Sequence, residues 1–209
     1  MNYFITGTDT DVGKTYFTAL LTRALRSRGL DTLALKPICC GPRDDVILLR
    51  HAADLEVSED VLNPLWFTAP AAPLVAARED GREVSLAALQ SWYADLRSQR
   101  RSLLVEGAGG WLVPVTRDVT VADLAVAFQL PVLVVVANRL GCLNHALLTV
   151  ESIRARGLTC AGLVLNTLSA DDSIAAATNR AILEEVCDVP IRAEITLGQT
   201  SLAWVELES

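Results

Sequence analysis

Short apolar runs alternate along the chain with longer stretches in which hydrophobic residues recur every three or four positions. The short runs predict buried strands, and the longer stretches predict amphipathic helices. The first helix pattern has its apolar stripe at Phe17, Leu20, Leu21, Ala24 and Leu25. The predicted strands cover residues 2–6, 32–35, 103–105, 132–137, 163–165 and 191–195. The predicted helices cover residues 16–28, 45–55, 86–98, 121–128, 142–156 and 171–186, and a short terminal element covers 202–207.

Strands and helices alternate about six times along the chain. This alternation predicts an α/β fold with an open, mostly parallel sheet flanked by helices on both faces. Residues 56–82 contain Pro64, Pro70 and Pro73, follow neither pattern, and are expected to form a long ordered loop or a lid. Because no linker composition marks a boundary, residues 1–209 are expected to form a single domain.

A glycine-bounded loop, Gly-Thr-Asp-Thr-Asp-Val-Gly-Lys-Thr at residues 7–15, joins the first predicted strand to the first predicted helix. Strand, loop, Gly-Lys-Thr and helix is the context of a phosphate-binding P-loop, so the expected fold is P-loop NTPase-like. Backbone N–H groups and the helix N-terminus would hold the anion. Lys14 is expected to reach the β and γ phosphates, and the Thr15 hydroxyl to hold Mg²⁺. Between Gly7 and Gly13 the loop has one residue more than the common pattern.

Polar residues follow several of the predicted strands, where ligands of open α/β sheets bind. Lys36 could neutralise a transferring phosphoryl group or a substrate carboxylate, or it could be a surface lysine. Glu106 ends a buried strand, and with Thr15 and either Asp44 or Asp45 it could bind Mg²⁺.

The strand over 163–165 is followed by Asn166, which could contact an adenine edge or could simply occupy a turn. The glycines after Glu106 allow a close backbone approach to a ligand, although a tight turn explains them equally well.

Composition and charge narrow the choice of partners. The chain is 51% hydrophobic and 5% aromatic, with a net charge of −7 and no long basic run. Nucleic acids and anionic membranes are therefore not expected partners. The five cysteines, with no C-x-x-C pair, indicate reduced thiols in the cytoplasm and neither a disulfide framework nor a zinc site. The longest apolar run, 132–137, is too short to span a bilayer.

Several motifs together resemble the dethiobiotin synthetase family. Residues 7–15 are similar to its modified P-loop, including the additional residue, and Lys36-Pro37 is similar to its lysine–proline loop. Residues 105–111 and 140–145 resemble two further signatures, and Asn63-Pro64 resembles the intervening loop. The resemblance runs from residue 3 to about residue 166 and is weaker beyond. The P-loop alone is shared with partition ATPases and cobyrinate-type amidotransferases, whereas the combination is specific.

The resemblance implies ATP- and Mg²⁺-dependent ring closure of 7,8-diaminononanoate with CO₂ to dethiobiotin, in biotin biosynthesis. One amine takes up CO₂ as a carbamate, and the γ-phosphoryl group of ATP passes to it, giving a carbamic–phosphoric anhydride. The second amine then closes a cyclic urea as phosphate leaves. Lys14 and Lys36 would be the catalytic residues, stabilising the carbamate and the developing phosphoryl charge. No Ser-His or Cys-His pair is needed.

The resemblance also implies the remaining site residues. The metal ligands are expected to be Thr15, Asp45 and Glu106. The nucleotide-binding residues are expected to be Asp11, Val12, Gly13, Lys14, Thr15, Tyr16, Asp45, Glu106, Gly107, Ala108, Gly109, Asn166, Thr167, Ile195, Thr196 and Leu197. The substrate-binding residues are expected to be Thr10, Lys36, Cys40, Leu140, Gly141, Cys142, Leu143 and Asn144. A homodimer is implied, with the site at the subunit interface. The helix start at residues 140–144 of one subunit would receive the substrate carboxylate in the site of the other.

The sequence departs from the family pattern at four places. Cys40 stands where the family has serine, Arg139 where it has lysine, and Ile195-Thr196 where it has Ile-Pro. The loop between Gly41 and Asp44 is also short, so the choice of Asp45 over Asp44 as the metal ligand rests on the alignment with the family pattern.

Other classes of function remain open. A ParA/MinD-like switch ATPase that binds a protein or DNA is disfavoured by the acidic composition and by Thr8 and Asp9, where such a loop carries a lysine. A related amidotransferase-type ligase is a further alternative. A non-catalytic remnant of the fold is disfavoured because Lys14, Thr15, Lys36 and Glu106 occur together.

Overall fold

The computed structural model describes residues 1–54, 57–99, 102–167 and 173–202. Six strands form one sheet in the order β2-β5-β1-β6-β7-β8, and every neighbouring pair is parallel. These strands are β1 (Asn2–Gly7), β2 (Thr32–Leu35), β5 (Ser102–Gly110), β6 (Val132–Ala137), β7 (Cys160–Thr167) and β8 (Ile191–Thr196). The predicted α/β fold with an open parallel sheet is confirmed.

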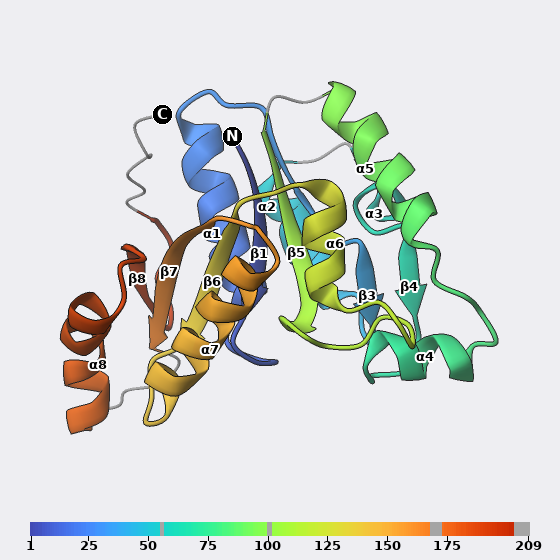
Figure 1. Ribbon diagram of the computed structural model, residues 1–209. Coiled ribbons are helices and arrows are strands. Elements are labelled where there is room, and N and C mark those ends of the chain that lie inside the picture. Colours follow the sequence, from blue (N-terminus) through green and yellow to red (C-terminus); the bar gives the residue numbers. More distant parts are fainter. Residues whose placement is uncertain (55–56, 100–101, 168–172, 203–209) are drawn as a thin grey trace.

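Helices cover both faces of this sheet (Figure 1). They are α1 (Lys14–Ser27), α2 (Asp44–Ala52), α3 (Glu59–Leu62), α4 (Pro73–Glu79), α5 (Leu86–Gln99), α6 (Val121–Phe128), α7 (Cys142–Ala155) and α8 (Ile174–Val186). Helix α1 packs on one face, and α6 and α7 pack on the other. No helix within the described ranges is both long and apolar enough to cross a membrane.

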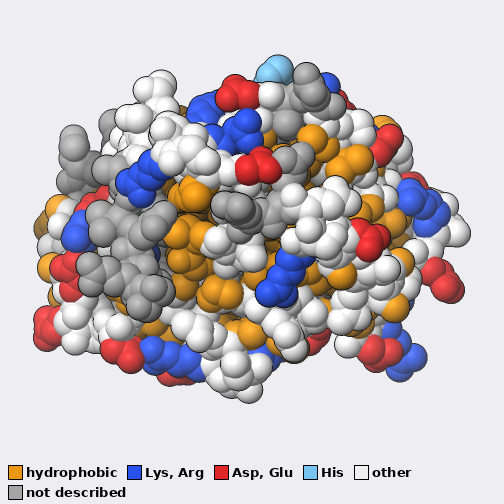
Figure 2. Space-filling model, turned by 90° about the horizontal axis from the view of Figure 1, so that it is seen from above, with side chains coloured by type: hydrophobic (Ala, Val, Ile, Leu, Met, Phe, Trp, Pro, Cys, Tyr) orange, Lys and Arg blue, Asp and Glu red, His pale blue; other side chains and the backbone are white. Residues whose placement is uncertain are grey.

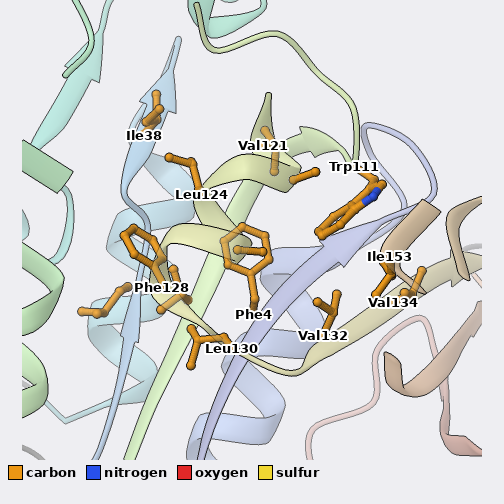
Figure 3. Close-up of a cluster of buried hydrophobic side chains, with 14 of the residues drawn as sticks. Phe4, Ile38, Trp111, Val121, Leu124, Phe128, Leu130, Val132, Val134 and Ile153 are labelled. Carbon is orange, nitrogen blue, oxygen red and sulfur yellow. The ribbon is translucent and has the colours of Figure 1, made fainter. Parts of the chain in front are cut away.

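Alternating side chains of the central strand β1 enter the two hydrophobic layers. Tyr3 and Ile5 pack with the apolar stripe of α1, whereas Phe4 packs with α6. Figure 3 shows Phe4 among Trp111, Val121 and other apolar side chains of that layer. A strand buried on both faces reads as a continuous apolar run, which is why these strands are visible in the sequence.

Residues 56–82 differ from the expected loop. Helices α3 and α4 and strand β4 (Leu65–Phe67) lie within this range, and β4 pairs in parallel with β3 (Ile38–Cys40) as a second, two-stranded sheet. Elements of three or four residues are too short to show a period, so the prediction of an irregular segment was wrong at these places.

Strand β5 continues beyond its predicted end through Glu106 to Gly110. The glycines after Glu106 are compatible in the sequence with a close approach to a ligand or with a tight turn, and in the structure they continue the strand. A Cβ at Gly107 would lie 2.7 Å from Val121 Cγ1, so Gly107 lets α6 pack closely. Helix α8 begins at Ile174, with the Ser173 hydroxyl accepting from the Ala176 N–H. The predicted helix start at 171 and most of the terminal element at 202–207 lie outside the described residues.

The amino ends of the strands form the end of the molecule opposite the P-loop. Figure 2 views the molecule from the side on which β1 begins, and there basic side chains lie in small groups among acidic and hydrophobic ones.

Candidate functional site

The P-loop connects the carboxyl end of β1 to α1. Gly7 is required there because a Cβ would lie 2.5 Å from Val12 Cγ2. Asp11 and Gly13 adopt left-handed φ angles of 55° and 89°. Gly13 is the N-cap of α1, and no side chain caps this helix. The first N–H groups of α1 therefore remain suited to bind an anion.

Four segments bring charged side chains together beside this loop. Lys36 Nζ donates to Asp45 Oδ2 at 2.6 Å and to Glu106 Oε1 at 2.5 Å. The Thr15 hydroxyl donates to the same Glu106 oxygen at 2.7 Å. Lys14 Nζ donates to the Asp9 carbonyl at 2.9 Å. The structure thus joins Lys36 to both carboxylates that the sequence suggested as metal ligands.

The two lysines differ in their electrostatic environment. Burial lowers the pKa of Lys36, but the charges of Glu106 and Asp45 outweigh it, so this pKa is raised above the usual lysine range. For Lys14 burial dominates, and its pKa is lowered in spite of the attraction to Glu106. Lys36 therefore keeps its proton more firmly than Lys14 does.

Lys36 contacts both carboxylates of the cluster. Glu106 is fully buried, and a buried charge needs a charged or hydrogen-bonded partner, which Lys36 and Thr15 provide. Burial would raise the pKa of Asp45, but the charge of Lys36 and hydrogen bonds to Lys36 and Thr15 hold it below its usual value.

Asn63 fixes the backbone of Lys36 and was not predicted as a site residue. Its side-chain amide donates to the carbonyls of Lys36 at 2.8 Å and Leu65 at 2.9 Å. The Lys36 N–H donates to the Leu62 carbonyl at 2.9 Å. The Asn63-Pro64 pair was visible in the sequence, but its bonds depend on β4 lying beside Lys36.

A cavity of about 860 Å³ opens over this cluster. The residues of the P-loop and the charged cluster that line it are Thr10, Asp11, Gly13, Lys14, Thr15, Tyr16, Lys36 and Asp45. A second group of lining residues is small or apolar: Ile38, Cys39, Cys40, Leu48, Pro70, Ala71, Ala72, Pro73, Ala108, Gly109 and Val113. Most of the second group was not predicted, because small apolar residues carry no chemical signal in a sequence.

Cys40, which is expected to contact the substrate, lies on the wall of the cavity. Burial raises the pKa of its thiol to about 11. The thiol is therefore protonated at neutral pH and is a weak hydrogen-bond donor rather than a nucleophile. All five cysteines are free thiols.

Four of the expected nucleotide-binding residues, Asn166, Thr167, Ile195 and Thr196, lie together at the ends of β7 and β8, outside the lining of the cavity. Asn166 is 1% exposed, and its amide donates to the Val12 carbonyl at 2.8 Å. The Tyr16 hydroxyl donates to the carbonyl of Gln199. Thr167 and Thr196 are paired across β7 and β8, Ile195 is buried, and Leu197 is 75% exposed.

Residues 140–144 do not line the cavity of their own chain. Leu140 is 86% exposed, and Gly141 is an N-cap without a side-chain cap at the start of α7. Nη2 of the neighbouring Arg139 lies 4.0 Å from Oδ2 of Asp9 in the P-loop. An open helix start thus stands on the surface next to the P-loop.

The oxygen atoms of this cluster suit a magnesium ion. Glu106 Oε2 is buried without a hydrogen-bond partner, and Asp45 and the Thr15 hydroxyl lie close by. Mg²⁺ is commonly held by one or two carboxylates with a hydroxyl and phosphates. Among the described residues no three His, Cys, Asp or Glu side chains gather as an all-protein metal site. The residues therefore fit an ion that is shared with a nucleotide.

The chain is similar to known proteins in both sequence and fold. A family model described as an AAA domain matches residues 1–199. The chain is 41% identical over 198 residues to an ATP-dependent dethiobiotin synthetase BioD of Akkermansia muciniphila, covering 95% of this chain and 93% of that one. It is 47% identical over 173 residues to a protein of the same name from Anaeromyxobacter sp. strain K, covering 81% and 78%.

Solved structures share the fold. The septum site-determining protein MinD of Pyrococcus horikoshii, solved with Mg-ADP, has a TM-score of 0.59 and 18% identity, covering 94% of this chain and 82% of its own. The signal recognition particle receptor FtsY of Elizabethkingia anophelis has a TM-score of 0.60 and 15% identity, covering 98% and 62%. At these identities the likeness concerns the fold alone.

Proposed function

Because the chain belongs to the ATP-dependent dethiobiotin synthetase family, we propose that it closes the cyclic urea of dethiobiotin from 7,8-diaminononanoate, CO₂ and ATP. The chain is an ATP-dependent ligase with small-molecule substrates, and this ring closure is a step of biotin biosynthesis. ADP and phosphate are the other products.

One observation of the structure supports this proposal most strongly. The Lys36 ammonium lies within 2.6 Å of a carboxylate oxygen of Asp45 and of Glu106, beside the P-loop and on the wall of the cavity. A buried cation next to the phosphate-binding loop suits an anionic phosphoryl acceptor, and a carbamate is such an acceptor.

The chemistry needs positioned charge more than a protein nucleophile. A carbamate oxygen attacks the γ-phosphorus, and the bond to the β–γ bridging oxygen breaks as ADP leaves. The second amine then attacks the carbamate carbon, phosphate leaves with the former carbamate oxygen, and the amine proton passes to solvent. Lys36, whose pKa is raised, holds its charge throughout and orients the carbamate, while Lys14 offsets the charge on the transferring phosphoryl group.

Thr15, Asp45 and Glu106 are the proposed ligands of Mg²⁺. When bound with the nucleotide, the ion would neutralise phosphate charge. The unpartnered Glu106 Oε2 supports this assignment, because a buried carboxylate oxygen without a donor is otherwise costly.

Nucleotide and substrate contacts are proposed around this centre. Gly107, Ala108 and Gly109 follow Glu106 along β5, and the last two line the cavity. Thr10 and Cys40 are proposed to meet the diamine. Most of these positions have little side chain, so their contribution would come from the backbone.

We propose a homodimer in which residues 140–144 of one subunit receive the substrate carboxylate in the site of the other. The open N-terminus of α7 and the exposed Leu140 support this role, since such a helix start attracts an anion. We also expect the enzyme to act in the cytoplasm, where its five thiols stay reduced.

A switch ATPase of the MinD type is the second candidate, and only the shared fold favours it. Omission experiments separate the two. ATP consumption should require both 7,8-diaminononanoate and bicarbonate, and leaving out either one should reduce it to background. ATP hydrolysis that DNA stimulates and that ignores the diamine would contradict the proposed ligase.

A further inference from the structure

Asn166 makes a contact that a role in reading adenine does not explain. It lies near the end of β7, its side chain is 1% exposed, and its Nδ2 donates to the Val12 carbonyl at 2.8 Å. The two residues are 154 positions apart, and β6 separates β7 from β1 in the sheet. The amide thus reaches across the sheet edge to the P-loop itself.

We propose that Asn166 is a positioning residue, which fixes the Val12–Gly13 peptide so that the P-loop holds its phosphate-binding form before nucleotide arrives. This inference rests on the proposed function, because it concerns the ATP site of that reaction. It assigns Asn166 to the triphosphate end of the nucleotide.

Peptide planarity connects the contact to phosphate binding. In a trans peptide the carbonyl and the following N–H point in opposite directions. With the Val12 carbonyl turned toward Asn166, the Gly13 N–H is turned the other way, and Gly13 lines the cavity. If this peptide turned over, a carbonyl oxygen would face the phosphates and repel them.

The loop needs such a restraint because its conformation is unusual. Asp11 and Gly13, on either side of Val12, both have positive φ, at 55° and 89°. A non-glycine residue in the left-handed region is strained and persists only where its surroundings hold it. Val12 is held twice, because its side chain packs against the bare Gly7 and its carbonyl accepts from Asn166.

Inorganic triphosphate tests the inference directly, because it has phosphates and no base. Asn166→Ala removes the donor, and Asn166→Leu removes it with a side chain of similar shape and somewhat larger volume. Both variants should bind magnesium triphosphate roughly tenfold or more weakly by calorimetry, since a buried carbonyl left without its donor disfavours the binding form. The ratio of ATP affinity to triphosphate affinity should stay near that of the parent.

Asn179→Ala is the matched control. Asn179 is 3% exposed and its amide donates to Asn138 and Arg139, so the variant loses a similarly buried amide away from the Val12 carbonyl. Its triphosphate affinity should equal that of the parent. The inference would be overturned if both Asn166 variants bound triphosphate as tightly as the parent and only ATP more weakly. That result would mean that Asn166 contacts the base instead.

Two further measurements separate a failure of the Asn166 inference from a failure of the proposed function or of folding. If the parent binds ATP and triphosphate but shows no diamine-dependent turnover, the proposed function fails while the Asn166 test stands. If the variants do not fold, hydrogen exchange on the parent decides the question. The Asn166 side-chain amide should be protected with and without triphosphate, and fast exchange in the ligand-free protein would overturn the proposal.

Discussion

Lys36 and Lys14 line the same cavity but have different hydrogen-bond partners. Lys36 is tied to Asp45 and Glu106, whereas Lys14 donates to a backbone carbonyl of its own loop. A lysine between two carboxylates is fixed in position and charge, while a lysine on a neutral carbonyl can move to an arriving phosphate at small cost. The pair therefore suits an enzyme that orients one anion and then binds a second.

Glu106→Gln tests the central carboxylate. The change removes the buried negative charge that Lys36 and Thr15 contact, and it weakens the proposed metal site. We expect kcat to fall by about 100-fold or more, the usual order for a preorganised charge at a reacting centre, and the Mg²⁺ requirement to shift to higher concentration.

Glu83→Gln is the control, because Glu83 is exposed and lies away from the cavity. Steady-state kinetics at several Mg²⁺ concentrations would compare the two variants. Unchanged kcat and Mg²⁺ dependence in Glu106→Gln would contradict the site described above.

The lowered pKa of Asp45 predicts that the free energy of unfolding depends on pH. Its folded-state pKa is lowered by Lys36, so its contribution is fully present above the unfolded value of about 3.9 and is lost as pH falls through the lower folded value. The advantage of the parent over Asp45→Asn in free energy of unfolding should therefore shrink below about pH 4. Urea denaturation from pH 7 to pH 3 measures it, and a constant difference would contradict the ion pair.

At the scale of elements, the close packing of β5 on α6 explains why Gly107 is glycine. A Cβ there would lie 2.7 Å from Val121 Cγ1 and 3.1 Å from the Phe4 ring. Gly107→Ala should lower the free energy of unfolding by about 1–3 kcal/mol, because a filled core cannot accept a methyl group without shifting. Ser91→Ala, on the exposed side of α5, should change it little. Equal stability of both variants in urea would contradict this packing.

The long buried strands and the amphipathic helices could be predicted, because each repeats a periodic pattern over several turns or residues. Lys36 and Glu106 could be predicted as neighbours, because parallel strands bring their carboxyl ends to one edge. Strands β3 and β4 could not, since three residues show no period. The partner of Asn166 could not either, because an amide at a strand end is equally consistent with a ligand, a turn or a distant carbonyl.

At the scale of the whole molecule, the cavity and the open start of α7 are separate on one chain. A second subunit would bring them together. We therefore expect light scattering to give a mass of about twice 22.5 kDa. Leu148→Glu, at a 57% exposed position of α7, should weaken the dimer and raise KM for the diamine more than KM for ATP. A fully active monomer at every concentration would contradict this proposal.

The surface agrees with a small-molecule enzyme. The net charge is −7, and the two lysines of the chain, Lys14 and Lys36, both lie at the P-loop site, whereas the other basic side chains are arginines. An acidic chain with a local positive site favours small anionic ligands over nucleic acid.

The most direct test of the function follows the bicarbonate carbon into the product. The purified protein would be incubated with 7,8-diaminononanoate, ATP, Mg²⁺ and ¹³C-bicarbonate, and the product would be analysed by mass spectrometry. The account predicts dethiobiotin labelled in its ureido carbonyl, formed in equal amount with ADP and phosphate and lost in Lys36→Ala. ADP formation without a labelled cyclic urea would contradict it.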